Sequence, residues 1–220
     1  MPKIEDFPYA RRHNTLRLLG YDYNSIDQLC AITMVVSSRR PLFADMLLAK
    51  AVLTCLLTAK ALHRLQVRAF TLMPDHLHCI AGMREPEQNL PRLIGEFKSF
   101  TTQLYWKRSR EVVNAQEVSL PSTNVTRSGM KESHSLLAAL IDGRAVLRPE
   151  VVELKNWPHV RPGHFLKKTL WQTRFYDHVI RNSHDLEENL GYIEMNPVRA
   201  GFVSHPSFYP YTGFLPQVRL

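Results

Sequence analysis

Two histidines separated by a single residue are the first candidates for chemistry in this sequence. His76 and His78 lie in the stretch Met-Pro-Asp-His-Leu-His-Cys at residues 73–79. On an extended strand, side chains two residues apart point to the same face. Two imidazoles held side by side on a rigid strand can supply half of a divalent-metal site. The spacing alone leaves open a simpler interpretation, in which one histidine caps a turn and the other is half-buried.

A tyrosine and an asparagine near the end of the sequence form the second candidate. Tyr192 and Asn196 are four residues apart in a segment that favours a helix, so their side chains are neighbours on one helix face. Pro197 follows, and a residue that precedes proline disfavours the helical conformation. We therefore expect the helix to fray near Asn196 and to free its amide for a ligand. By itself, a lone helical tyrosine is more often an aromatic residue of the core or the surface.

Around these candidates the sequence resembles the single-tyrosine HUH transposases, and within them the REP-associated tyrosine transposases. The blocks that carry the resemblance follow one another in the family's order. They are residues 73–79, residues 171–181 (Trp-Gln-Thr-Arg-Phe-Tyr-Asp-His-Val-Ile-Arg) and residues 192–201 (Tyr-Ile-Glu-Met-Asn-Pro-Val-Arg-Ala-Gly). A weaker match joins residues 17–23 with residues 38–43.

The resemblance implies a role for each candidate. In that family the helix tyrosine is the nucleophile and a polar residue one turn later completes the metal site. Those residues are here Tyr192 and Asn196, with His76 and His78 as the other ligands. The implied activity is that of a metal-dependent endonuclease and strand transferase acting on single-stranded, hairpin-bearing repeat DNA. Family precedent names Mg²⁺ or Mn²⁺ as the cofactor, and Mn²⁺ is the better compromise because imidazole suits softer ions than Mg²⁺.

A tyrosine nucleophile is well suited to strand transfer. Attack by the phenol oxygen on a phosphodiester leaves a covalent phosphotyrosine, so the bond energy is kept for rejoining. Phenolate is also a better leaving group than an alkoxide, because the pKa of a phenol is about 10. Tyr176 is a rival nucleophile, since it lies beside His178 as a possible base. It lacks a polar partner one helical turn away, which favours Tyr192.

The charge of the chain favours a polyanionic partner. The formal net charge is +8, and such a balance suits DNA, although by itself it does not exclude RNA or a membrane surface. We expect DNA contacts from basic and aromatic residues near the motifs. The candidates are Arg11, Arg12, Arg17, Arg39, Arg40, Lys98, Trp171, Arg174, His178 and Arg181. For Trp171 a place in the core is an equally good interpretation.

Composition narrows the class of protein. The three cysteines form no Cys-x-x-Cys pair, so neither a thiolate zinc cluster nor a disulfide scaffold is indicated. The N-terminus is polar and does not look like a signal peptide. The most apolar run, residues 42–65, is interrupted by Asp45, Lys50 and Lys60, which is typical of an amphipathic helix and not of a membrane span. We expect a cytoplasmic monomer or homodimer with no membrane partner.

The pattern of apolar residues predicts alternating strands and helices. We expect strands over residues 31–37, 67–72, 76–81 and 164–169, and helices over residues 42–65, 90–107 and 186–195. Leu47 and Phe100 are expected on the inward faces of the first two helices, and Asp185 as the N-cap of the last. The order favours an α+β fold, a ferredoxin-like or RRM-like antiparallel sheet with helices packed on one face. The HUH endonuclease fold implied by the resemblance agrees.

The chain length suits a single domain spanning residues 1–220. We expect a basic N-terminal arm over about residues 1–25, and a polar insertion or long loop over about residues 110–163, outside the family blocks. Two other functions remain open. One is a binding protein for structured DNA or RNA that has lost the chemistry, and the other is a zinc hydrolase with His164 or His178 as a third histidine ligand.

Overall fold

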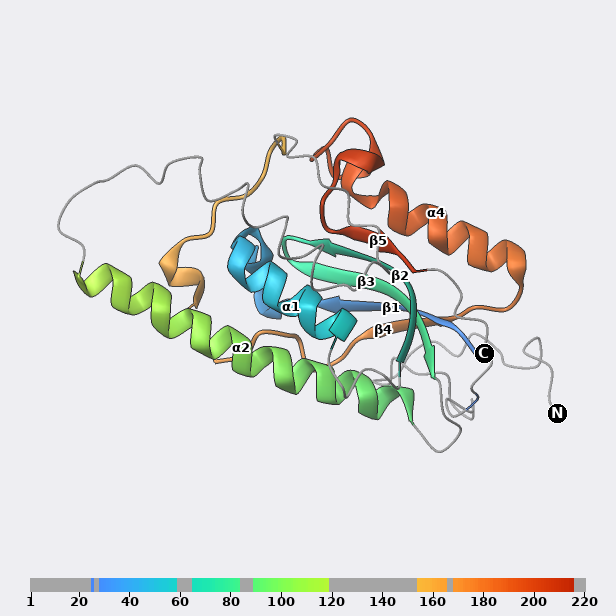
Figure 1. Ribbon diagram of the computed structural model, residues 1–220, viewed down its shortest axis with the longest axis horizontal. Coiled ribbons are helices and arrows are strands. Elements are labelled where there is room, and N and C mark those ends of the chain that lie inside the picture. Colours follow the sequence, from blue (N-terminus) through green and yellow to red (C-terminus); the bar gives the residue numbers. More distant parts are fainter. Residues whose placement is uncertain are drawn as a thin grey trace.

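An antiparallel sheet and the helices packed on it make up the fold (Figure 1). The computed structural model describes residues 25, 28–58, 65–83, 89–118, 154–165 and 168–215. In chain order, the strands and helices are β1 (Cys30–Val35), α1 (Met46–Thr58), β2 (Leu65–Met73), β3 (His76–Met83), α2 (Leu90–Val118), β4 (Tyr176–Val179), α4 (Ser183–Arg199) and β5 (Thr212–Phe214).

The central hairpin β2–β3 anchors the sheet. The sheet has five strands in the order β4-β1-β3-β2-β5, and all neighbouring pairs are antiparallel. A tight turn at Pro74 and Asp75 joins the hairpin strands, as expected from their sequence. Val36 and Phe43 donate backbone hydrogen bonds to the carbonyls of this turn, so it is held from both sides. The expected α+β class with an antiparallel sheet is confirmed.

The two faces of the sheet bury different helices. Alternating residues such as Ile32, Phe70 and Cys79 pack under α1 and α2 in the main core. The intervening residues, among them Ala69 and Ile80, pack under α4 on the opposite face. Figure 1 shows α1 and α2 on one side of the sheet and α4 on the other. The expectation that all helices share one face was therefore wrong.

Several predicted boundaries also differ from the structure. Residues 162–165 form a 3-10 helix, and the strand expected there is instead β4, more than ten residues later. Helix α1 begins only after a separate 3-10 turn at Leu42–Ala44. Leu47 and Phe100 are 56% and 49% exposed, so neither lies on an inward face. Strand β5 was not predicted at all, because three residues are too few to show an alternating pattern.

Helix α4 starts and ends differently from the prediction. Its N-cap is Asn182, whose side chain accepts a hydrogen bond from the backbone N–H of Asp185. Asp185 lies in the first turn, where a carboxylate is favourable to the helix dipole. The helix does not fray at Asn196, because Ala200 donates its backbone N–H to the Asn196 carbonyl beyond Pro197.

Almost all of the predicted arm and most of the predicted insertion lie outside the described residues, as do Arg11, Arg12 and Arg17. The insertion was expected from about residue 110, but helix α2 continues to Val118. No helix in the described part of the chain is both long enough and apolar enough to span a membrane.

Candidate active site

The histidine pair lies at the start of β3, on the sheet face that α4 covers. His76 and His78 alternate with the buried residues Leu77 and Cys79, so both imidazoles leave the main core. Their ring centroids are 4.6 Å apart, and the rings meet edge to face at 82°. The structure therefore places the two imidazoles side by side, as the spacing predicted.

A protein oxygen holds one nitrogen of each imidazole. His78 Nδ1 shares a hydrogen bond of 2.7 Å with Thr33 Oγ1 on β1, and His76 Nδ1 lies 2.5 Å from Asp75 Oδ1. Arg39 donates to the other oxygen of Asp75 at 3.2 Å. Among the described residues, neither Nε2 atom takes part in a recorded hydrogen bond. A histidine held through Nδ1 presents Nε2 to a ligand in a fixed orientation.

The protonation states also favour ligand binding. Burial, and after it the neighbouring His76, lower the pKa of His78 to about 3, although the carboxylate of Asp75 acts in the opposite direction. His78 is therefore a neutral imidazole at neutral pH, which is the form that binds metal ions. Burial raises the pKa of Asp75, but the hydrogen bonds and charges of His76 and Arg39 outweigh this and hold it below its usual value. Asp75 is thus a carboxylate that orients His76.

Tyr192 lies beside the histidine pair although it belongs to a distant segment. It is on α4, and its ring centroid is 5.3 Å from that of His78, with the rings at 85°. The side chain is 45% exposed, so its hydroxyl is within reach of a large substrate. The guanidinium of Arg199, two turns later on the same helix, lies 5.3 Å from the centroid of the tyrosine ring.

Asn196 follows Tyr192 by one turn of α4 and is 9% exposed. Because the helix continues through Pro197, the amide of Asn196 is positioned by regular helix geometry and not by a frayed end. Within the part of the chain that the structure describes, the side chain of Asn196 hydrogen-bonds to neither histidine. The structure thus joins His76, His78 and Tyr192 directly, and Asn196 lies further along the same helix.

A row of residues in register crosses the sheet through His78. Its partner on β1 is Thr33 and its partner on β2 is Thr71; these pair in turn with Tyr176 on β4 and Thr212 on β5. Thr212 and Thr71 share a hydrogen bond of 2.7 Å between their hydroxyls. One polar row therefore connects both edges of the sheet with the histidine at its centre.

Three of the residues predicted to bind DNA form hydrogen bonds within the fold. Arg40 is 7% exposed and donates hydrogen bonds to the Tyr105 hydroxyl and to backbone carbonyls. Lys98 donates to three consecutive carbonyls of residues 172–174, and burial lowers its pKa to about 8. Trp171 is 5% exposed and donates to Thr101, so it is a core residue. These contacts argue against a phosphate contact at each position.

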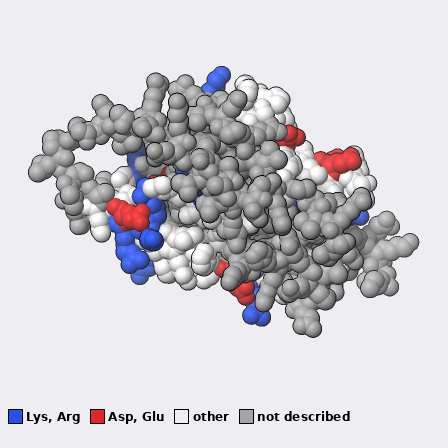
Figure 2. Space-filling view, viewed as in Figure 1, with Lys and Arg blue, Asp and Glu red and all other residues white. Residues whose placement is uncertain are grey.

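The other described candidates for DNA binding are exposed. They are Arg39, whose side chain is 66% exposed, and Arg174, His178 and Arg181. Figure 2 shows described Lys and Arg side chains gathered towards the C-terminal end of α2, with acidic side chains among them. That segment carries Lys107, Arg108 and Arg110 next to Glu111. The described charges on this face are therefore mixed.

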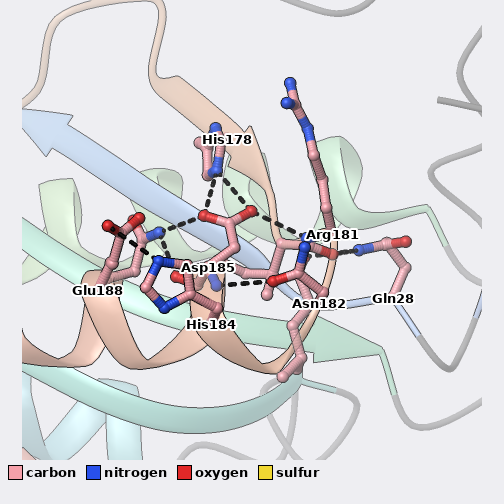
Figure 3. A network of polar contacts seen from close by, with 10 residues as sticks. Gln28, His178, Arg181, Asn182, His184, Asp185 and Glu188 are labelled. Carbon is pink, nitrogen blue, oxygen red and sulfur yellow. Dashed lines mark hydrogen bonds and ion pairs between the residues drawn. The ribbon is translucent and has the colours of Figure 1, made fainter. Parts of the chain in front are cut away.

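His178 belongs to a polar network at the start of α4 (Figure 3). Its Nε2 lies 2.9 and 3.0 Å from the two carboxylate oxygens of Asp185. Asp185 also accepts from the backbone N–H of Arg181 and from the side-chain amide of Asn189. Gln28 donates to the carbonyl of Ile180 from the other side of the network. The network fixes the end of β4 against the first turn of α4.

Thr33, Asp75 and Arg199 are the site residues that sequence reasoning missed. Asp75 and Arg199 lie within the family blocks, directly before His76 and seven residues after Tyr192, so their positions could have indicated them. Thr33 carries no such indication. It becomes a partner of His78 only through the register of β1 on β3.

The donors around the histidine pair fit a divalent ion. Two oriented Nε2 atoms suit an ion that accepts imidazole, and the amide oxygen of Asn196 is a suitable harder ligand. Within the described residues, no group of three or more His, Cys, Asp or Glu could hold a metal ion. A site built on the pair would therefore be completed there by a neutral oxygen, such as that of Asn196, or by the substrate itself.

Comparisons with known proteins agree with the resemblance seen in the sequence. Residues 27–119 match the family described as "Transposase IS200 like". A REP-associated tyrosine transposase of Escherichia coli (strain K12) is 43% identical over 47 residues, which are 21% of this chain and 28% of that protein. A Haemophilus influenzae protein (strain ATCC 51907 / DSM 11121 / KW20 / Rd), provisionally named as a REP-associated tyrosine transposase, is 42% identical over 151 residues, which are 69% of this chain and 60% of that protein. The chain thus spans less than two thirds of the length of both curated relatives.

A solved structure of a REP-associated tyrosine transposase bound to a REP hairpin is also similar. The superposition covers 87% of this chain and 79% of the other, with a TM-score of 0.49 and 19% sequence identity. The family resemblance itself is confirmed by the family match and by the Haemophilus relative.

Proposed function

Because this chain is a relative of the REP-associated tyrosine transposases, we propose that it cleaves and transfers single strands of DNA with Tyr192 as the nucleophile. The observation that carries the proposal is the ring contact of His78 with both His76 and Tyr192. These residues come from separate sequence blocks, and their meeting beside the exposed ring of Tyr192 is what a metal-assisted nucleophile requires.

In the proposed step, the phenol oxygen of Tyr192 attacks the phosphorus of one phosphodiester. A bond forms between this oxygen and phosphorus, and the bond from phosphorus to one bridging sugar oxygen breaks. The phenol loses its proton, and the released sugar oxygen gains one. The phosphotyrosine keeps the energy of the broken bond, so a second strand end can reverse the step and be joined.

The surrounding residues position the reactants. Thr33 and Asp75 fix the two imidazoles, and Arg199 lies beside the tyrosine ring, where its charge can attract the phosphate. A divalent ion held by His76 and His78, with Asn196 as a further ligand, would neutralise charge on the scissile phosphate. Imidazole ligands favour Mn²⁺ over Mg²⁺ in this role.

The substrate that we propose is single-stranded DNA that carries a hairpin. The name of the curated relatives associates them with REP sequences, and the exposed cations Arg39, Arg174 and Arg181 suit a phosphate backbone. The zinc hydrolase is not favoured, because within the described residues no third histidine joins the pair. His178 is instead paired with Asp185.

The experiment that tests the proposal is a search for the covalent intermediate. The protein is incubated with Mn²⁺ and a panel of labelled single-stranded hairpins, and denaturing gels show whether label migrates with protein. We expect a covalent adduct with at least one hairpin. Tight hairpin binding with neither adduct nor cleavage across the panel would favour the alternative of a catalytically silent binding protein.

A further inference from the structure

A pocket of about 150 Å³ opens directly beside Tyr192. Residues of β1 and β4 line one side of it, and Asn189, Tyr192 and Ile193 of α4 line the other. His78 also contributes to the lining, so the pocket adjoins the proposed nucleophile and the proposed metal site. Neither of these roles uses the pocket itself.

The size and position of the pocket suit a single planar ring. A protein cavity of about this volume accommodates a benzene molecule. Enzymes that modify a base hold it, out of the stack, in a fitted pocket at the reacting atoms, which shows that such a pocket can retain an unstacked base. An unpaired base has no partner strand to leave, which makes single-stranded DNA the easiest substrate for such capture.

Tyr176 offers the surface on which such a base can stack. It lines the pocket, is 46% exposed, and stands beside Thr33 in the row that leads to His78. Among the described residues, its ring makes no recorded contact with another aromatic ring. An exposed aromatic ring is the usual stacking platform for single-stranded nucleic acid, because every base has a π-face.

The polar rim of the pocket is rigid. His178 and Asn189 both line the pocket, and Asp185 holds both through hydrogen bonds of 2.8 to 3.0 Å. Figure 3 shows His178 beside Asp185. Asn182 and the backbone N–H of Arg181 fix Asp185 in turn. A rim held from several sides keeps its shape before a ligand arrives, which lowers the entropic cost of binding.

We propose that this pocket receives one unpaired base of the DNA strand, next to the phosphate that Tyr192 attacks, and that the base stacks on Tyr176. The assignment rests on the proposed function, because that function places a single strand at Tyr192. Capturing the neighbouring base fixes the strand's position along the site. Tyr176 is then a positioning residue that determines which bond is cut.

The test combines DNA that lacks one base with a protein variant that lacks the aromatic ring of Tyr176. Hairpin oligonucleotides with a single-stranded flank are made with one abasic residue at each flank position in turn. Their affinity is measured by fluorescence anisotropy in EDTA, for the wild type and for Tyr176→Leu, Tyr176→Phe and Phe100→Ala. Cleavage positions are mapped separately with Mn²⁺. Phe100 is the matched control, since it is an exposed aromatic residue on α2, across the sheet.

We expect one abasic position, adjacent to the mapped cleavage point, to weaken binding to the wild type about tenfold, the usual effect of one stacked base. Tyr176→Leu should weaken binding of the intact strand similarly and abolish the effect of that abasic residue. Tyr176→Phe should restore this effect, and Phe100→Ala should leave it in place. An abasic effect that persists in Tyr176→Leu, or that vanishes in Phe100→Ala, overturns the proposal.

The two proposals fail in distinguishable ways. If the expected coupling between Tyr176 and one base is present but the strand is never cut, the pocket is a base-binding site without a scissile phosphate beside it, and the proposed function falls. If the strand is cut through a covalent adduct while no flank position is coupled to Tyr176, the proposed function stands and the pocket assignment falls.

Discussion

The phenol ring of Tyr192 stands edge-on to the imidazole of His78, with ring centroids 5.3 Å apart. This contact joins a residue of α4 to a residue of β3, the centre strand of the sheet. Because Thr33 of β1 holds His78 of β3 by a hydrogen bond, Tyr192 packs against a side chain that two adjacent strands position. Tyr192 and the histidine pair therefore form one site, and the proposed role of each residue can be tested by its own mutation.

Replacement of Tyr192 by Phe should abolish both strand cleavage and the covalent adduct. The change removes one oxygen and keeps the ring contact with His78, so folding and hairpin affinity should remain close to those of the wild type. Adduct formation is measured on denaturing gels, and affinity by anisotropy. Tyr176→Phe should still form the adduct. An adduct that persists in Tyr192→Phe and disappears in Tyr176→Phe would assign the reaction to Tyr176.

The residues that orient the histidines should control the requirement for metal. His76→Ala and His78→Ala should each abolish cleavage with little loss of hairpin binding, since most affinity comes from backbone contacts. Thr33→Val and Asp75→Asn keep both imidazoles but loosen their orientation. They should raise the Mn²⁺ concentration for half-maximal cleavage by about 10- to 100-fold.

His205→Ala is the control for these changes, because this exposed histidine caps the short 3-10 helix after α4 and hydrogen-bonds with Ser207. Its requirement for Mn²⁺ should equal that of the wild type. Unchanged Mn²⁺ titrations in both Thr33→Val and Asp75→Asn would mean that the histidine pair is not the metal site.

The hairpin and the long helices were predictable because the sequence patterns that indicate them are local. The alternation around residues 65–83, the turn at Pro74 and the apolar period of α1 and α2 each lie within one short window. Strand β5 and the position of β4 depend on pairing with distant partners, which no local pattern records. The same holds for the split of the helices between the two faces of the sheet.

The candidate site divides in a similar way. His76 and His78 share a face through strand periodicity, and Tyr192 was assigned through the resemblance. The internal hydrogen bonds of Arg40 and Lys98 could not be predicted, because a cation in the sequence does not reveal whether backbone carbonyls already accept its hydrogen bonds. Long-range packing decides whether a cation is buried. A buried cation forms hydrogen bonds within the fold, whereas an exposed cation can bind a phosphate.

Arg40 should matter for stability and not for DNA binding. Arg40→Met removes the hydrogen bonds from Arg40 to buried carbonyls and to the Tyr105 hydroxyl, so the free energy of unfolding should fall by at least about 2 kcal/mol. Arg39→Met, at an exposed side chain, should change it by about 0.5 kcal/mol or less. Urea unfolding measures both. A stable Arg40→Met protein with weakened hairpin binding would restore Arg40 to the DNA contacts.

The exposed cations should determine the salt dependence of binding. If Arg39, Arg174 and Arg181 each neutralise a phosphate, changing any one to Gln should reduce the slope of log affinity against log salt by roughly one unit. Arg92→Gln is the control, since this exposed arginine lies on α2 and pairs with Glu96. Slopes that equal the wild-type slope in all three variants would mean that these charges only solvate the protein.

Asp185 should make the protein sensitive to acid. Burial raises the pKa of this carboxyl, but hydrogen bonds from the Arg181 backbone and from His178 outweigh it and hold the pKa below its usual value. The stabilisation is therefore complete above about pH 4, the ordinary pKa of Asp, and is lost as the pH falls through the lower folded value.

Asp185→Asn should accordingly be less stable than the wild type at pH 7, and the difference should shrink below about pH 4. Urea unfolding across pH measures the difference. Glu187→Gln, at an exposed position on the same helix, is the control and should track the wild type. A difference for Asp185→Asn that stays constant down to pH 2 would show that the carboxylate charge contributes nothing.

The order of the strands has a consequence for how the candidate active site assembles during folding. The β2–β3 hairpin closes through a two-residue turn, whereas β4 and α4 must return from far along the chain. Local pairings generally form before distant ones, because less chain entropy is lost in closing them. The histidine pair should thus exist on a folded hairpin before the tyrosine arrives. Pulse-labelled hydrogen exchange during refolding should show amides of β3 protected earlier than those of α4, and the capacity to cut DNA would then appear only in the final step of folding.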